Sequence, residues 1–151
     1  MYRSKGFGLL ELMVVLVISS LLISIAVPAY RQFVQREKIA GAIGGISAIA
    51  LEIGRFQHKN NNALPLTLND LGIEIPLDPW EQAYEYLNIA AAEPGNGAFR
   101  KDGNLNLLNT DFDLYSVGRD GDSKGPLSAK ASRDDIVRAN NGAFIGLAEN
   151  Y

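Results

Sequence analysis

The chain has 151 residues, a formal net charge of −3 at pH 7 and no cysteine. That length suffices for one domain with an attached segment, and a mildly acidic chain gives no reason to expect nucleic-acid binding. The fold must be stabilised without disulfides. The chain also has no Gly-x-Ser-x-Gly elbow, no phosphate-binding loop and a single histidine, so we expect no enzyme and no catalytic residues.

An apolar run from Phe7 to Ala29 contains one ionisable residue, Glu11. Because a hydrocarbon core about 30 Å thick takes roughly 20 helical residues to cross, the run is long enough for a membrane-spanning helix. Arg3 and Lys5 precede it, which predicts a cytoplasmic N-terminus. The alternatives are a cleaved secretory signal, which has a shorter apolar stretch, and a buried core helix, which is rarely apolar on every face.

Glu11 is unusual because a carboxylate within a bilayer is costly and implies a partner; the alternative is a glutamate near enough to the interface to stay hydrated. The segment KGFGLLELMVV, residues 5–15, resembles the class III signal of type IV pilins and type II secretion pseudopilins. In that family a Gly precedes the cut, Phe follows it, and Glu is the fifth mature residue. Gly8 departs from the Thr or Ser that is common there.

The resemblance implies that a prepilin peptidase removes residues 1–6, cutting between Gly6 and Phe7 and methylating the new N-terminus. Cleavage would leave an ammonium on Phe7. In a filament, Glu11 of one subunit would pair with the Phe7 ammonium of another. A charge that is costly alone in lipid becomes tolerable when it is paired, so we expect assembly to relieve the penalty and to fix the axial register.

The helical pattern continues past the membrane run (residues 7–29) into an amphipathic helix over residues 30–56. Pro28 predicts a kink rather than an end. One apolar stripe steps by four and three residues: Ile39, Ile43, Ile46, Ala50 and Ile53. We expect this stripe to pack against a sheet, the alternative being a surface for a partner. Three glycines, Gly41, Gly44 and Gly45, weaken the middle of the helix.

The remaining residues, 57–151, are predicted to form a periplasmic α+β domain. We expect a polar loop at 57–63 and a short helical turn over 64–71, capped by Thr67 or Asn69. Alternating patterns predict strands at 84–87 and 112–117, with 104–108 and 98–101 as further candidates; a helical turn is expected at 136–139. The fold class is therefore α+β, with a long N-terminal helix on a small antiparallel sheet of three or four strands.

Two further motifs extend the resemblance over most of the chain: Asp78-Pro79-Trp80 followed by Tyr84-Glu85-Tyr86, and DLYSVGRDG at residues 113–121. They are similar to the major pseudopilins of type II secretion. The resemblance implies an inner-membrane, single-pass subunit of a periplasmic homo-oligomeric filament, the pseudopilus. Its partners would be minor pseudopilins, the inner-membrane assembly platform and the prepilin peptidase. The alternative is a type IV pilus subunit, although such pilins usually carry a C-terminal cysteine pair.

The loop after the 112–117 strand is rich in oxygen ligands: Asp120, Asp122, Ser123, Ser128, Ser132, Asp134 and Asp135. Ca²⁺ takes six to eight oxygens. The resemblance implies a structural calcium ion on Asp120 and on Asp134 or Asp135, with carbonyls from Val117 and Asp122. The loop is not an EF-hand, because Lys124 and Ala131 occupy ligand positions. The alternative is a solvated loop in which Asp134 and Asp135 cap a helix that begins at Ile136.

Overall fold

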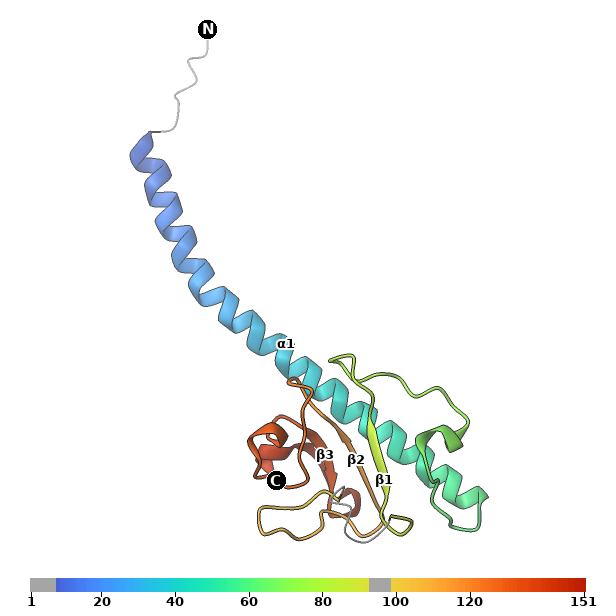
Figure 1. Cartoon of the computed structure of the whole chain (residues 1–151). Coiled ribbons are helices and arrows are strands. Elements are labelled where there is room, and N and C mark those ends of the chain that lie inside the picture. The colour runs from blue at the N-terminus through green and yellow to red at the C-terminus, as the bar shows by residue number, and fades with distance from the viewer. Residues whose placement is uncertain (1–7, 93–98) are drawn as a thin grey trace. The chain divides into compact units, whose positions relative to one another are not determined.

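The computed structural model describes residues 8–92 and 99–151 (Figure 1). The chain divides after Glu37 into two units, and one helix, α1 (Leu9–Lys59), contributes to both. The second unit combines the C-terminal part of α1 with a four-stranded antiparallel sheet. The predicted α+β class, with a long N-terminal helix and a small sheet, is confirmed.

The first unit is the apolar N-terminal part of α1. By length and composition this helix can span a membrane, and an 18-residue window of it has a mean hydropathy of 2.6. Pro28 lies inside the helix, so the prediction that it does not end the helix is confirmed. The hydroxyls of Ser20 and Ser24 donate to the carbonyls of Val17 and Leu21, each at 2.8 Å. These two hydroxyls are thus bonded to the helix's own backbone, which lowers the cost of placing them in lipid.

In the second unit, α1 buries one stripe against the sheet. Its fully covered side chains are Ala42, Ile46, Ile49 and Ile53, and they form one core with Tyr84, Phe112, Leu114 and Ile136. Of the predicted stripe, Ile46 and Ile53 are buried, and the other three residues are partly buried and pack against this core: Ile39, Ile43 and Ala50. The stripe is therefore an intramolecular packing surface, as expected. The helix ends at Lys59, three residues later than predicted. Asn61 and Asn62 follow with positive φ, a conformation that asparagine tolerates.

The sheet has the order β1-β2-β3-β4, and every pair is antiparallel. Its strands are β1 (Glu85–Asn88), β2 (Phe112–Ser116), β3 (Ile136–Ala139) and β4 (Phe144–Leu147). Successive side chains of a strand point to opposite faces. Phe112 and Leu114 accordingly face α1, whereas Val137 and Ala139 join a second cluster with Leu108, Leu127 and Ala148. The sheet is covered by α1 on one face and by loops on the other.

Two strand predictions are confirmed and two are wrong. The patterns at 84–87 and 112–117 correspond to β1 and β2. Of the helical turn predicted over 64–71, the second half is confirmed as the 3₁₀ turn Leu68–Leu71, with Thr67 at its N-cap. Residues 104–108 form no strand; Leu107 makes only an isolated bridge to Lys101. Lys101 also makes an isolated bridge to Pro126, and the described residues 99–101 form no strand of the sheet. Residue 98 lies outside the described residues.

The segment Ile136–Ala139, predicted as a helical turn, is strand β3. All four of its residues are buried, because β3 lies between β2 and β4 and is covered on both faces. The N-cap pattern at Ser132–Asp135 pointed to a helix. Packing between two strands overrode it, since Ile136 and Val137 are β-branched and suit a buried strand. The C-terminal apolar residues, whose role the sequence left open, form the edge strand β4.

The three helix glycines are not equivalent, which gives a matched test. A Cβ on Gly45 would lie 2.0 Å from the Tyr84 hydroxyl oxygen, whereas one on Gly44 would meet nothing within 4 Å. We expect Gly45→Ala to lower the free energy of unfolding by about 1–3 kcal/mol through overpacking. Gly44→Ala should raise it by about 1 kcal/mol through helix propensity.

The measurement is thermal unfolding of the full chain in detergent micelles, followed by the fluorescence of the single tryptophan, Trp80. Trp80 lies in the second unit, so its signal reports that unit and not the membrane helix. Equal melting temperatures for the Gly44→Ala and Gly45→Ala variants would contradict the packing of Tyr84 against α1.

Candidate functional site

The N-terminal part of α1 presents apolar side chains on all sides. Glu11 lies in the first helical turn, where the helix dipole favours a negative charge. The predicted cut site between Gly6 and Phe7 lies outside the described residues. The exposed apolar side chains, here called the N-terminal apolar surface, are Leu9, Leu10, Leu12, Met13, Val14, Val15, Leu16, Val17, Ile18, Leu21, Leu22, Ile23, Ile25 and Val27.

That surface needs another apolar environment. Leu9, Leu16 and Ile25 are 77%, 68% and 66% exposed. Apolar area left in water costs roughly 25 cal/mol per Å² relative to burial, and a patch of this extent marks a membrane or protein contact. Within it, Glu11 is the one carboxylate. The arrangement therefore suits lipid for a single chain and helix–helix packing for an assembly.

The two motifs in the second unit meet in space. The Asp78 Oδ1 atom accepts the backbone N–H groups of Trp80 and Gln82 at 2.9 and 2.8 Å. Its other oxygen accepts the hydroxyl of Ser116 at 2.5 Å, and Ser116 Oγ accepts the N–H of Gly118 at 3.1 Å. Asp78 is buried, so it joins the Asp-Pro-Trp turn to the end of β2. These motif residues have a structural role.

Two of the predicted calcium ligands, Asp120 and Asp134, accept hydrogen bonds from backbone N–H groups. Asp134 Oδ2 accepts the N–H groups of Arg119 and Asp120 at 2.9 and 3.1 Å, and Asp120 Oδ1 accepts that of Asp122 at 2.9 Å. A Cβ on Gly118 would lie 2.3 Å from the Asp134 carbonyl oxygen, and Gly118 has φ +69°. Asp134 therefore stabilises the turn that follows β2. Position 118 in this turn requires glycine, because its φ is positive and a Cβ would clash with Asp134.

Asp135 is fully buried and faces a different way. Its Oδ2 atom accepts the Ser123 hydroxyl at 2.6 Å and pairs with the guanidinium of Arg100. Burial raises the pKa of Asp135 to about 6, against the opposing effects of Ser123 and Arg100. The guanidinium of Arg100 is the cation that pairs with this carboxylate.

The predicted carboxylate ligands do not converge on one point in the described part of the chain. Among residues 8–92 and 99–151, no three His, Asp or Glu side chains gather as a metal site would require. Asp135 is bonded to Arg100 and Ser123. The exposed Asp122 has a carboxylate oxygen 3.8 Å from the Lys124 ammonium nitrogen. Val117 is half-buried. Calcium on Asp120, Asp122, Asp134, Asp135 and Val117 stays a prediction, and no helix starts at Ile136 for the acids to cap.

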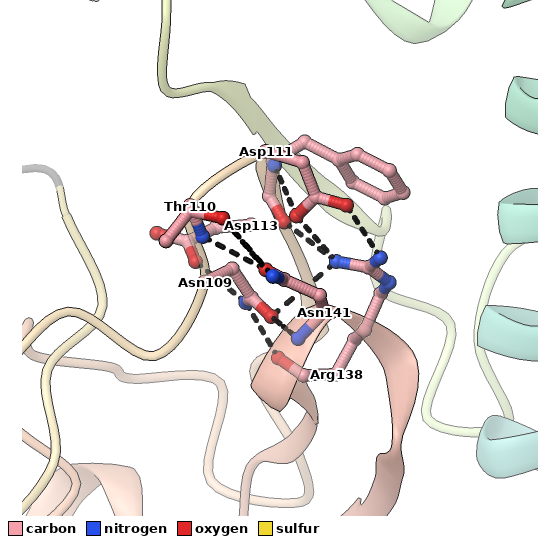
Figure 2. A network of polar contacts seen from close by, with 7 residues as sticks. Asn109, Thr110, Asp111, Asp113, Arg138 and Asn141 are labelled. Carbon is pink, nitrogen blue, oxygen red and sulfur yellow. Dashed lines mark hydrogen bonds and ion pairs between the residues drawn. The ribbon is translucent and has the colours of Figure 1, made fainter.

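A second buried arginine, Arg138 on β3, joins a network of polar contacts, which Figure 2 shows. Arg138 donates to both carboxylate oxygens of Asp111 at 2.9 and 2.7 Å, to the Phe112 carbonyl at 3.0 Å and to Asn109 Oδ1 at 3.3 Å. Asn109 in turn donates to Asp113 at 2.9 Å. Sequence reasoning missed both arginines. Their partners lie far along the chain, and no local spacing marks them.

The Asp111–Arg138 pair should make the stability of the fold decrease as pH falls. Although burial opposes it, hydrogen bonding and charge from Arg138 hold the pKa of Asp111 below its usual range. A carboxyl with a lowered folded-state pKa stabilises the fold above its unfolded pKa of about 3.9 and loses that contribution as pH falls through the folded value. Burial raises the pKa of Asp113 and of Asp135. These two carboxyls therefore act in the opposite direction, because ionising them as pH rises lowers the stability of the fold.

We therefore expect the stability difference between the wild type and Asp111→Asn to be constant above about pH 5 and to shrink as pH falls below 4. Melting curves of both proteins from pH 3 to pH 7 measure it. A difference that grows on acidification would contradict the lowered pKa of Asp111.

Comparisons with known proteins agree with this arrangement. The family description "Prokaryotic N-terminal methylation motif" matches residues 1–27. Over 143 residues the chain is 29% identical to the type II secretion system core protein G of Pseudomonas aeruginosa, covering 82% of this chain and 89% of that protein. The chain carries the N-terminal methylation motif of type IV pilins and is similar to a secretion core protein over most of its length.

The chain is also 30% identical over 101 residues to fimbrial protein Q of Moraxella bovis. That alignment covers 66% of the chain and 64% of the fimbrial protein. No solved structure matches. The similarity to core protein G extends into the second unit, which includes the Asp78–Ser116 link.

Proposed function

We propose that this chain is the major structural subunit of a type II secretion pseudopilus, a helical filament that helps drive protein export. The observation that carries the proposal is similarity to a secretion core protein over 82% of the chain. The N-terminal apolar surface supports it, since the same side chains suit lipid before assembly and neighbouring helices afterwards. The role is mechanical, and the residues at the methylation motif are substrates of another enzyme.

The assembly step follows from the charges. Removal of residues 1–6 by the prepilin peptidase places an ammonium on Phe7, four residues before Glu11. A buried carboxylate paired with that ammonium loses much of its desolvation penalty, and the pair forms only when two subunits are in one axial register. Subunits would wait in the inner membrane with a cytoplasmic N-terminus, and the second unit would lie in the periplasm. Minor pseudopilins and the assembly platform would be the other partners.

The second candidate is a type IV pilus subunit for adhesion, motility or DNA uptake, which the similarity to fimbrial protein Q favours. Deleting the gene in its native bacterium separates the two. The secretion role predicts that exported proteins accumulate inside the cell, that surface pili persist, and that a plasmid copy restores export. Loss of surface pili with normal export would establish the pilus role instead.

A further inference from the structure

A buried arginine from the segment between β1 and β2 contacts the loop that joins β2 to β3. Arg100 is 2% exposed. Its Nη1 atom donates to the Ser123 hydroxyl and to the Lys124 carbonyl, the latter at 2.6 Å, and its Nη2 atom donates to the Asp135 carboxylate. Three oxygens of this loop, from a hydroxyl, a carbonyl and a carboxylate, therefore converge on one cation.

Arg100 is itself held firmly to the sheet. Its backbone N–H donates to Asp113 at 2.8 Å, and its carbonyl accepts the N–H of Leu108 at 3.1 Å. The guanidinium carbon lies 4.2 Å from the centre of the Tyr115 ring, on β2, a cation–π contact. The guanidinium is thus anchored before it reaches the loop.

The loop closes around this anchor. Lys101 donates its N–H to the Gly125 carbonyl, and Leu127 donates to the Lys101 carbonyl, both at 2.9 Å. The Ser132 hydroxyl bonds both the N–H and the carbonyl of Lys124 at 2.8 Å. The Lys124 carbonyl accepts from Ser132 and Arg100 together, so the guanidinium is at the point where the two arms of the loop meet.

These acceptors are of the oxygen types that Ca²⁺ takes from a protein, but a five-donor guanidinium fork already occupies them. Asp135 is fully buried, a buried carboxylate needs a paired cation or a metal, and the Arg100 guanidinium is the cation that it contacts. We propose that Arg100 is the resident cation of the β2–β3 loop, in place of the calcium ion that the resemblance predicts, so that the order of this loop does not depend on metal.

The other acidic residues of the loop agree with this assignment. Asp120 and Asp134 each accept backbone N–H groups of the loop itself through one carboxylate oxygen, so they hold the loop backbone without a metal. The inference concerns this loop alone and does not rest on the proposed secretion role. A secretion subunit and a pilus subunit would both keep a metal-independent loop.

The test uses limited trypsin digestion of the full chain in detergent micelles. The loop offers four exposed tryptic sites, Arg119, Lys124, Lys130 and Arg133, and mass spectrometry reports the rate of cleavage at each. For the wild type we expect the same loop cleavage rate in 1 mM EDTA and in millimolar calcium. For Arg100→Met, which leaves Asp135 without its cation, we expect loop cleavage to be faster by roughly tenfold or more.

Lys101→Met is the matched control, because it removes the neighbouring positive charge and should leave the loop cleavage rate within about twofold of the wild type. Calcium that slows cleavage of the wild-type loop would overturn the proposal, and so would an Arg100→Met loop cleaved at the wild-type rate. If Arg100→Met does not fold, the EDTA and calcium comparison on the wild type still decides.

Discussion

Glu11→Ala should abolish filament assembly while leaving the second unit folded. In an assembled filament Glu11 would be the buried partner of the Phe7 ammonium, and removing one member of a buried pair costs about 3–5 kcal/mol. Since every 1.4 kcal/mol is tenfold in an equilibrium constant, the amount of sheared filament should fall by roughly 100-fold or more. The chain should remain in the membrane fraction, because the apolar run is intact.

Two variants isolate the charge from its surroundings. Glu11→Gln keeps the shape of the side chain and removes the charge, so it should fail as Glu11→Ala does. Glu37→Gln removes an exposed carboxylate elsewhere on α1 and should assemble normally. The N-terminus of each variant is checked by mass spectrometry, so that a processing failure is not taken for an assembly failure. Normal filament abundance with Glu11→Ala would show that the pairing is not needed.

Arg138→Met should destabilise the second unit more than any surface change. The variant leaves Asp111, the Phe112 carbonyl and Asn109 without their shared donor, and it removes a guanidinium 3.9 Å above the Phe112 ring. Breaking a buried pair costs about 3–5 kcal/mol. Because the Asp111 side chain is 32% exposed, we expect the lower end, about 3 kcal/mol, and a melting temperature lower by roughly 10 °C.

The measurement is again Trp80 fluorescence during thermal unfolding in micelles. Lys130→Met, on an exposed side chain, is the control for loss of a positive charge and should melt within about 1 °C of the wild type. The double variant Arg138→Met with Asp111→Asn should recover part of the loss, because the orphaned carboxylate is gone. A loss under about 1 kcal/mol for Arg138→Met alone would show that this network is not a main source of stability.

The parts of the fold that follow local rules were predictable from the sequence. The long helix follows from an apolar run with one ionisable residue, joined to a stripe with helical spacing, and β2 follows from the alternation over residues 112–117. Strand β3 was not predictable in this way. Its four residues are buried on both faces and show no alternation, and the preceding Ser132–Asp135 pattern imitates a helix N-cap.

The buried polar contacts of Arg100 could not be predicted from sequence patterns either. Arg100 pairs with Ser123 and Asp135, which follow it by 23 and 35 residues, so no spacing rule connects them. The acidic loop suggests a metal site, because its aspartates are typical calcium ligands and lie close together in the sequence. The cation that neutralises one of them is an arginine in a segment that the sequence read as a loop. Only tertiary structure brings the two together.

The most direct test of the secretion-filament account is the intact mass of the subunit in filaments purified from cells that carry the whole secretion system. The account predicts a filament whose subunit begins at Phe7 with a methylated N-terminus, and whose abundance depends on Glu11. A chain that stays in the membrane in its full 16.4 kDa form, with Met1 present and no filament in the sheared fraction, would contradict the account.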